Sequence, residues 1–172
     1  MEAVVYTSNT GSTEHYAKLL GHELSVSVYS TEEAGNKLPT GTEIIYLGWI
    51  MAGKIQRFGF ARKKYKICAV CAVGMGQTGT QRKEIRKKNN IPGKIPVFTL
   101  QGNFNVEKLH GMYKMMMSIM VKTAGKALEK KTDRTPEEED MLDMMLHGGE
   151  RVRIQNLQGV ISWYIRCEKL RI

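Results

Sequence analysis

Short apolar segments recur through residues 1–100, and stretches with helical spacing separate most of them. Helices are expected from Gly11 to His22, near Gly53 to Lys63 and near Thr78 to Lys88. Since parallel strands covered on both faces are continuously apolar, the alternation predicts an α/β fold with a doubly wound five-stranded parallel sheet and helices on both faces. The expected strands are Ala3 to Tyr6, Val26 to Tyr29, Glu43 to Leu47, Ile67 to Val73 and Ile95 to Leu100.

This fold class also predicts where a ligand binds. Right-handed crossovers place all the strand-to-helix loops along one edge of the sheet, and ligands of doubly wound folds bind there. These loops are therefore the first candidates for a ligand site.

The length of 172 residues predicts one domain, because the chain shows no repeat and no linker and its composition is that of a globular protein. The first twenty residues lack a signal-peptide pattern, and no apolar run approaches the ~20 residues that span a bilayer. A cytoplasmic location is expected, with peripheral contact at the inner face of the membrane as a further expectation.

The net charge of +9 favours an acidic partner, but the charge alone selects no class of partner. The clusters Arg62 to Lys64, Arg82 to Lys83 and Arg86 to Lys88 are expected to be solvated helix ends, and no nucleic acid partner is expected. Three cysteines are an odd number, so a disulfide framework is not predicted.

The turn after the first strand is rich in hydroxyl side chains. It lies where unpaired backbone N–H groups and the helix dipole favour an anion. Without a lysine or arginine it suits a monophosphate ester better than a triphosphate, and the Walker pattern is absent. The alternative is an ordinary turn in which Thr10 or Ser12 caps the helix. The candidate phosphate-binding residues are Ser8, Asn9, Thr10, Gly11, Ser12 and Thr13.

Thr7 to Glu14 resembles the S/T-x-T-G-x-T phosphate loop of flavodoxins, and the resemblance covers about the first hundred residues. The loop Gly48 to Lys54 and the long tail are most similar to the branch that contains menaquinone-dependent protoporphyrinogen oxidases. The resemblance implies a flavodoxin-like sheet, an FMN cofactor, and an isoalloxazine ring between the loops after the third and fourth strands. Trp49 is then expected to touch the ring. The resemblance assigns to the cofactor, besides the phosphate loop, Trp49, Ile50, Met51, Ala52, Gly53, Gly74, Met75, Gly76, Gln77 and Gly79.

Gly74 to Gly79 also reads as G-x-G-x-x-G, a dinucleotide fingerprint. That motif belongs to the first strand-helix turn and needs an acidic residue after the next strand, where this chain has none. In the flavodoxin-like interpretation these glycines let the backbone approach the flavin. Flavodoxins commonly stack a tyrosine from this loop on the ring, whereas this chain supplies Met75. The outer ring face is thus either open to a substrate or covered by the tail.

Neither the cysteines nor the histidines predict a metal or catalytic site. Cys68 and Cys71 are three residues apart within a strand, so their side chains point to opposite faces and are expected to be core thiols. The four histidines show no ligand spacing, and no catalytic acid or base is identified.

The tail from Asn105 to Lys131 reads as a basic amphipathic helix. Thr135 to Glu138 predict a capped helix that ends at Gly148, and a terminal helix is expected over about 157–170. Residues 103–149 thus form a helical insertion, which either packs as core or contacts a membrane, a quinone or a flat macrocycle. One face of the first helix is expected to carry Val106, Leu109, Met112, Met116, Ile119, Met120, Ala124 and Leu128. The terminal helix is expected to turn Val160, Ile161, Tyr164 and Ile165 to the sheet.

Three functions remain open after the sequence. The first is an FMN-dependent oxidoreductase that carries out the quinone-linked oxidation of protoporphyrinogen or a related small-molecule substrate. The others are an FMN electron carrier with a protein redox partner and a flavin-free binding module. The charge of +9 disfavours the carrier, since it would repel the basic docking faces of flavodoxin reductases.

Overall fold

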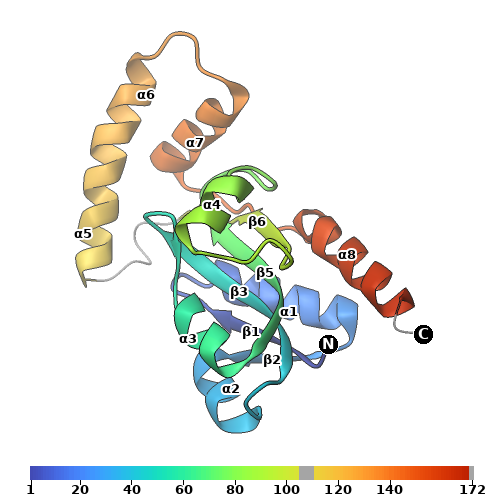
Figure 1. The fold of residues 1–172 in the computed structure, drawn as a ribbon. Coiled ribbons are helices and arrows are strands. Elements are labelled where there is room, and N and C mark those ends of the chain that lie inside the picture. The colour runs from blue at the N-terminus through green and yellow to red at the C-terminus, as the bar shows by residue number, and fades with distance from the viewer. Residues whose placement is uncertain (105–110, 171–172) are drawn as a thin grey trace.

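Five parallel strands form the centre of the fold in the order β2-β1-β3-β5-β6. The structure is a computed structural model that describes residues 1–104 and 111–170. The predicted α/β arrangement, with a parallel sheet and helices on both faces, is confirmed (Figure 1). The strands are β1 (Ala3–Thr7), β2 (Ser27–Ser30), β3 (Glu43–Met51), β5 (Lys66–Gly74) and β6 (Val97–Gln101).

The third strand is longer than predicted. The sequence placed a loop from Gly48 and a helix from Gly53, but β3 continues to Met51 and turns into the short antiparallel strand β4 (Lys54–Ile55). Ala52 and Gly53 both have positive φ, as in a two-residue type I′ hairpin. Gly48 permits this return, because a Cβ there would lie 2.4 Å from Ile55 Cγ2.

Two buried clusters cover the faces of the sheet. Val4, Ile45 and Leu47 of the strands pack with Tyr16 and Leu20 of α1 (Ser12–Leu24), and α8 (Gln158–Lys169) covers the same face. The opposite face is covered by α2 (Thr31–Lys37), α3 (Phe58–Lys64) and α4 (Arg82–Lys88). Neighbouring strand residues alternate between the two clusters, as the pleat requires.

Two helix predictions on the second face were wrong in part, and a third helix there was missed. α3 and α4 begin several residues later than expected, because the β3–β4 hairpin and a loop held by β6 take up the preceding residues. α2 was not predicted, although Ser30 and Glu33 form a capping box that is visible in the sequence.

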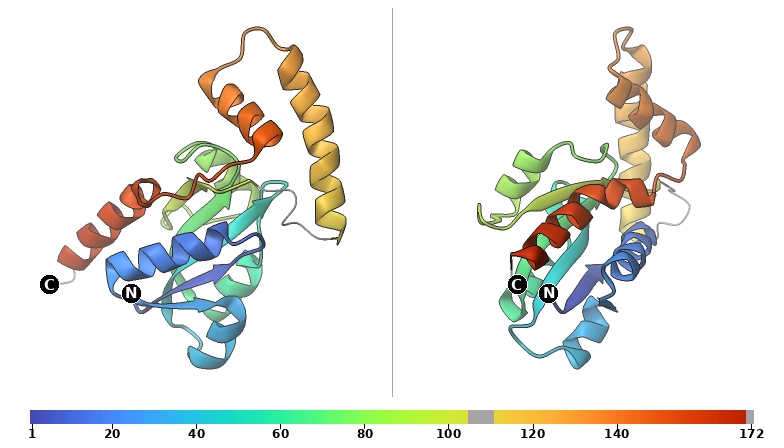
Figure 2. Two further views of the ribbon diagram at one scale, coloured as in Figure 1. Left: turned by 180° about the vertical axis from the view of Figure 1, so that it is seen from behind. Right: turned by 90° about the vertical axis from the view of Figure 1, so that its right-hand side faces the viewer.

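The insertion after β6 is a pair of helices that we call the arm, residues 111–147. It contains α5 (Gly111–Met120), a π-helical turn (Val121–Gly125), α6 (Lys126–Lys130) and α7 (Pro136–His147). Figures 1 and 2 show α5 and α6 as one long rod that projects beyond the sheet, with α7 folded back beside it. The predicted cap of α7 is confirmed, since Thr135 and Glu138 form a capping box.

Part of the predicted apolar face of the arm is wrong. Ile119 is 54% exposed, whereas its neighbour Met120, about 100° away around the helix, lines the cavity described below. The predictions for Val106 and Leu109, and for the side chains of Met112 and Met116, fall outside what the structure describes.

The terminal helix was predicted nearly correctly. α8 follows a 3-10 turn (Ile154–Leu157), buries Val160, and packs Ile161 and Tyr164 against the sheet. Ile165, however, is 46% exposed. Within the described residues, no helix is long and apolar enough to cross a membrane.

The cysteines are free thiols in the structure. Cys71 is completely buried, as predicted, and burial raises the pKa of its thiol. Cys68 is only half-buried, because it occupies the position where the pairing of β3 with β5 shifts register and skips a residue. Neither thiol lines the cavity described below.

Candidate functional site

A cavity of about 290 Å³ lies between the carboxyl edge of the sheet and the arm. Its volume is at the lower end of the range for small-molecule sites. The edge is the one that the sequence predicted from the strand-to-helix loops. Twelve predicted site residues line the cavity: Asn9, Thr10, Ser12, Thr13, Trp49, Ile50, Met51, Ala52, Gly74, Met75, Gly76 and Gln77.

The turn from β1 into α1 presents backbone N–H groups at one end of this cavity. Gly11 is the N-cap residue with φ +95°, a conformation that a side chain would strain. Among the described residues no side chain caps α1, whereas α2 and α7 each have a complete capping box. The alternative in which Thr10 or Ser12 caps the helix is therefore wrong.

The hydroxyls of the turn have separate roles. Ser8 Oγ accepts from the Gly11 N–H at 3.2 Å and so holds the turn closed. Ser12 Oγ accepts from the Asn103 N–H at 3.0 Å, which ties the turn to the segment after β6. Thr10 and Thr13 line the cavity, and Thr13 is 1% exposed. A bound anion would therefore meet N–H and O–H dipoles here.

The β3–β4 hairpin forms one wall of the cavity. Trp49 pairs with Val73 of β5, and its carbonyl accepts from the Gln56 N–H at 2.9 Å. Its indole lines the cavity. Trp49 thus has a strand backbone on one side and the hairpin return on the other, so its position is set by the sheet rather than by a free loop.

The loop after β5 is held by hydrogen bonds to β6. Gly79 N–H donates to the Thr99 carbonyl at 3.0 Å, and Thr99 Oγ1 donates to the Thr80 carbonyl at 2.6 Å. α4 begins only at Arg82, so the glycines do not open a helix as a dinucleotide motif requires. The dinucleotide interpretation is therefore not supported by the geometry.

Four predicted site residues do not line the cavity: Ser8, Gly11, Gly53 and Gly79. Ser8 and Gly11 are joined by the hydrogen bond from the Gly11 N–H to Ser8 Oγ, which holds the turn closed. Gly53 faces α4, where Asn89 Nδ2 donates to its carbonyl at 2.9 Å. Gly79 is held against β6 as described.

Twelve further lining residues were not predicted. They come from strand ends and from the arm, which no local motif places near the turn. They are Ala72, Val73, Thr80, Gln81, Thr99, Leu100, Gly102, Asn103, Phe104, Met117, Met120 and Met141.

The arm closes the outer side of the cavity with methionines. Met117 and Met120 come from α5, and Met141 comes from α7. The loop after β5 contributes Met75 where flavodoxins commonly have a tyrosine. The sequence left open whether this side is open to a substrate or covered by the tail. In the structure, residues of the tail line this side of the cavity.

None of the described lining residues is charged. Within the described part of the chain, no three histidine, cysteine, aspartate or glutamate side chains gather closely enough to hold a metal ion. The cavity can therefore bind an apolar ring system and an anion neutralised by dipoles, and it offers no ionisable group for acid-base catalysis.

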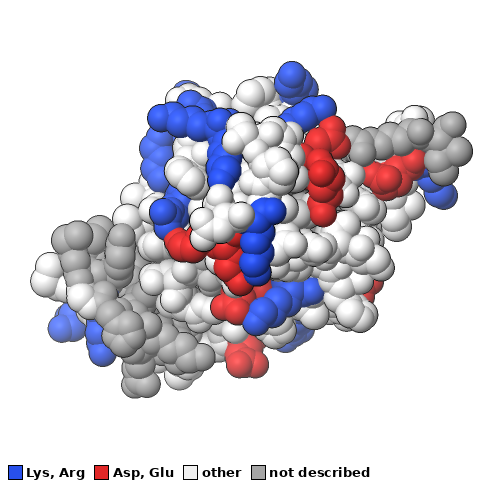
Figure 3. Space-filling model, turned by 90° about the horizontal axis from the view of Figure 1, so that it is seen from below, with Lys and Arg blue, Asp and Glu red and all other residues white. Residues whose placement is uncertain are grey.

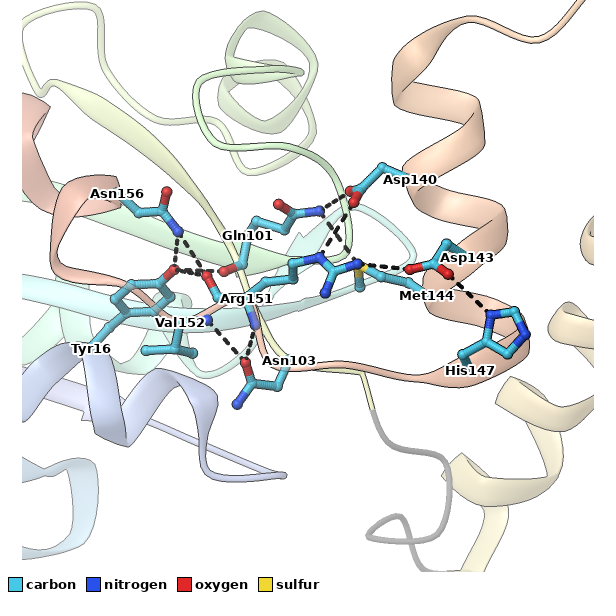
Figure 4. Close-up of polar contacts among 10 residues, drawn as sticks. All are labelled: Tyr16, Gln101, Asn103, Asp140, Asp143, Met144, His147, Arg151, Val152 and Asn156. Carbon is cyan, nitrogen blue, oxygen red and sulfur yellow. Dashed lines mark hydrogen bonds and ion pairs between the residues drawn. The ribbon is translucent and has the colours of Figure 1, made fainter.

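A polar network fixes the base of the arm to the sheet (Figure 4). Gln101 Nε2 donates to Asp140, and Arg151 contacts Asp140 Oδ1 at 3.3 Å and Asp143 Oδ2 at 3.0 Å. The hydrogen bond with His147, and then that with Arg151, lowers the pKa of the Asp143 carboxyl, so it remains charged at neutral pH.

Two further residues join this network to α1. Asn103 Oδ1 accepts from the N–H groups of Arg151 at 2.6 Å and Val152 at 2.9 Å. Tyr16 is completely buried, and its hydroxyl donates to the Gln101 carbonyl and accepts from Asn156 Nδ2, both at 2.6 Å. Burial raises the pKa of Tyr16, which keeps the phenol protonated as a donor.

Removing this hydroxyl should destabilise the protein. Tyr16→Phe leaves the partly buried Gln101 carbonyl without the hydroxyl donor and leaves Asn156 Nδ2 with only its bond to the Arg151 carbonyl, so we expect a loss of about 1–3 kcal/mol in the free energy of unfolding. Tyr65→Phe is the matched control, because the buried Tyr65 hydroxyl has no hydrogen-bond partner among the described residues. Urea unfolding should show Tyr65→Phe as neutral or stabilising, and equal effects of the two changes would contradict the network.

A comparison with protein-family models matches residues 3–133 to the flavodoxin domain. The match includes the turn from β1 into α1, the β3–β4 hairpin, the loop after β5 and the rod formed by α5 and α6, and it ends before α7. It does not identify the protoporphyrinogen oxidase branch. No curated protein and no solved structure matches the chain. Because the matched region covers well over half of the 172 residues, the chain belongs to the flavodoxin domain family; the region contains every described lining residue of the cavity except Met141.

Proposed function

We propose that the chain binds FMN in this cavity and works as an FMN-dependent oxidoreductase with an uncharged, apolar electron partner. The observation that carries the proposal is the uncapped N-terminus of α1 at the end of an uncharged cavity. A phosphate monoester fits such a site, because helix N-termini bind anions without a cation. FMN supplies the exchange of one or two electrons, and the protein supplies position, electrostatics and access.

The residues have distinct roles in this proposal. The N–H groups at the start of α1, with the Thr10 and Thr13 hydroxyls, hold the phosphate. Trp49 lies against one face of the ring, and the backbone of Gly74 to Gln77 meets its polar edge. The arm methionines exclude water from the other side. Without a proton donor in the described lining, any proton must come from solvent or from the partner.

The uncharged lining bears on the choice of partner. A porphyrinogen carries carboxylates, and burying them without a cation is costly. A quinone carries none and matches the methionine surface. Quinone-linked oxidation is therefore the favoured form of the proposal, and protoporphyrinogen is a less favoured substrate. Protoporphyrinogen would donate electrons to the flavin and a quinone would accept them, so the two half-reactions are measured separately by flavin absorbance: reduction of the oxidised flavin by protoporphyrinogen, and reoxidation of dithionite-reduced flavin by a quinone. If neither reaction occurs, an electron carrier is favoured.

Trp49 provides the test of the ring position. An indole in contact with a flavin quenches its fluorescence, so Trp49→Ala should raise the fluorescence of bound FMN several-fold and shift its reduction potential. Trp163→Ala is the control, because the indole of Trp163, on α8, packs against Phe98 of β6 with ring centroids 6.2 Å apart and does not line the cavity. Unchanged quenching in Trp49→Ala, measured at saturating protein, would place the ring elsewhere.

A further inference from the structure

The surface charge of the chain is unevenly distributed. On the face seen from below, acidic side chains lie among the basic ones (Figure 3). The rod of the arm differs, since from Gly111 to Lys131 it contains five lysines and a single carboxylate, Glu129. The outer side of this rod faces away from both α7 and the sheet in Figures 1 and 2.

One stripe along the rod combines these lysines with exposed apolar side chains. Met115 is 59% exposed and Ile119 is 54% exposed, and Lys122, Lys126 and Lys130 continue from them at steps of three or four residues. Residues at steps of four share one face of an α-helix, which places Met115 with Ile119 in α5 and Lys126 with Lys130 in α6. Lys122 lies in the π-helical turn that joins the two helices. We call these five residues the lysine stripe.

The lysines of the stripe repel one another. Among the described residues no carboxylate lies within ion-pair distance of Lys122, Lys126 or Lys130, whereas the neighbouring Lys131 pairs with Glu138 at 2.7 Å. Like charges at i and i+4 destabilise a helix. An anionic surface on the stripe would relieve this repulsion, and the long lysine stems would let Met115 and Ile119 enter an apolar layer.

The stripe and the cavity lie on opposite sides of the same helix. Met117 and Met120 line the cavity, while Met115 and Ile119 are exposed on the other side. A helix with its side chains is about 10 Å thick. A surface that binds the stripe therefore lies about one helix diameter from the cavity.

We propose that the lysine stripe binds the surface of an anionic lipid bilayer, with Met115 and Ile119 inserted between the headgroups. The combination of a basic rim with exposed apolar residues on one helix face is typical of interfacial helices. This surface goes beyond the proposed flavin chemistry and does not depend on it. Its consequence for that chemistry is access, because lipid-soluble molecules would be concentrated beside the cavity.

The test is sedimentation of the whole 172-residue chain with vesicles. Phosphatidylcholine vesicles containing phosphatidylglycerol should bind the protein, and pure phosphatidylcholine vesicles should bind it much more weakly. Changing Lys122, Lys126 and Lys130 to Gln should lower the partition coefficient ~100-fold, since each lysine near an anionic membrane contributes about fivefold. The matched control changes the exposed Lys63, Lys83 and Lys87 to Gln, which removes the same charge outside the arm.

A second variant tests insertion rather than adsorption. Met115→Ser with Ile119→Ser keeps the charge and should lower the partition coefficient about tenfold or more. Equal losses in the stripe and control lysine variants would overturn the proposal, as would binding of duplex DNA but not of vesicles. Because sedimentation requires no flavin, a failure here is distinguishable from a failure of FMN binding.

Discussion

Riboflavin is expected to bind this chain at least ~100-fold more weakly than FMN, because it lacks the phosphate that would meet the start of α1. Charge-assisted hydrogen bonds contribute about 1.5–3 kcal/mol each, and the turn offers several donors. Fluorescence titration of the flavin-free protein with each flavin measures the difference. Equal affinities would exclude the turn as a phosphate site.

The Thr10 hydroxyl should account for part of this difference. Thr10→Ala should weaken FMN about tenfold or more and leave riboflavin nearly unchanged, since only FMN carries the group that the hydroxyl meets. The riboflavin titration is thus an internal control for damage to the fold. A loss of equal size for both flavins would mean that Thr10 acts on the shape of the cavity.

Excision of the arm should expose the flavin without unfolding the sheet. The N–H groups of Phe104 and Gly149 each donate to the other's carbonyl, at 3.2 and 3.3 Å, so the two ends of the excised segment lie side by side. Neither core cluster contains a described residue of the arm, although Met144 and Met145 at the end of α7 are buried. Replacing residues 105–147 by a short Gly/Ser linker should therefore leave a folded protein that still prefers FMN to riboflavin.

The excised protein should differ in access to the ring. Without Met117, Met120 and Met141 the outer side of the cavity is open, so reoxidation of the reduced flavin by oxygen should accelerate about tenfold or more. Vesicle binding should be lost with the lysine stripe. Far-ultraviolet circular dichroism and thermal melting check the fold, and loss of folding together with flavin would show that the arm is part of the core.

The sheet could be predicted because its signal is local. The apolar runs of β1, β3 and β5 are buried on both faces, and this burial requires them to be apolar throughout. β4 has only two residues and depends on a hairpin turn at Ala52 and Gly53. Two residues are too few to show the alternation of apolar and polar side chains that predicts a strand. The capping box of α2 was a readable signal that the helix prediction did not use.

The candidate site was predictable where it consists of loops and not where it depends on tertiary contacts. Asn103 and Tyr16 become important only because the return segment after α7 passes between them. Met117 and Met141 reach the cavity because α5 and α7 fold together, and their spacing in sequence does not indicate this. The exposure of Ile119 likewise follows from which side of the rod meets α7.

The visible absorption spectrum of the purified protein tests the central proposal most directly. The account predicts flavin bands, either as isolated or after incubation with FMN, and release on denaturation of a flavin that chromatography identifies as FMN. A protein that stays colourless after incubation with FMN and removal of excess flavin would contradict the account and leave a flavin-free binding module on the same fold.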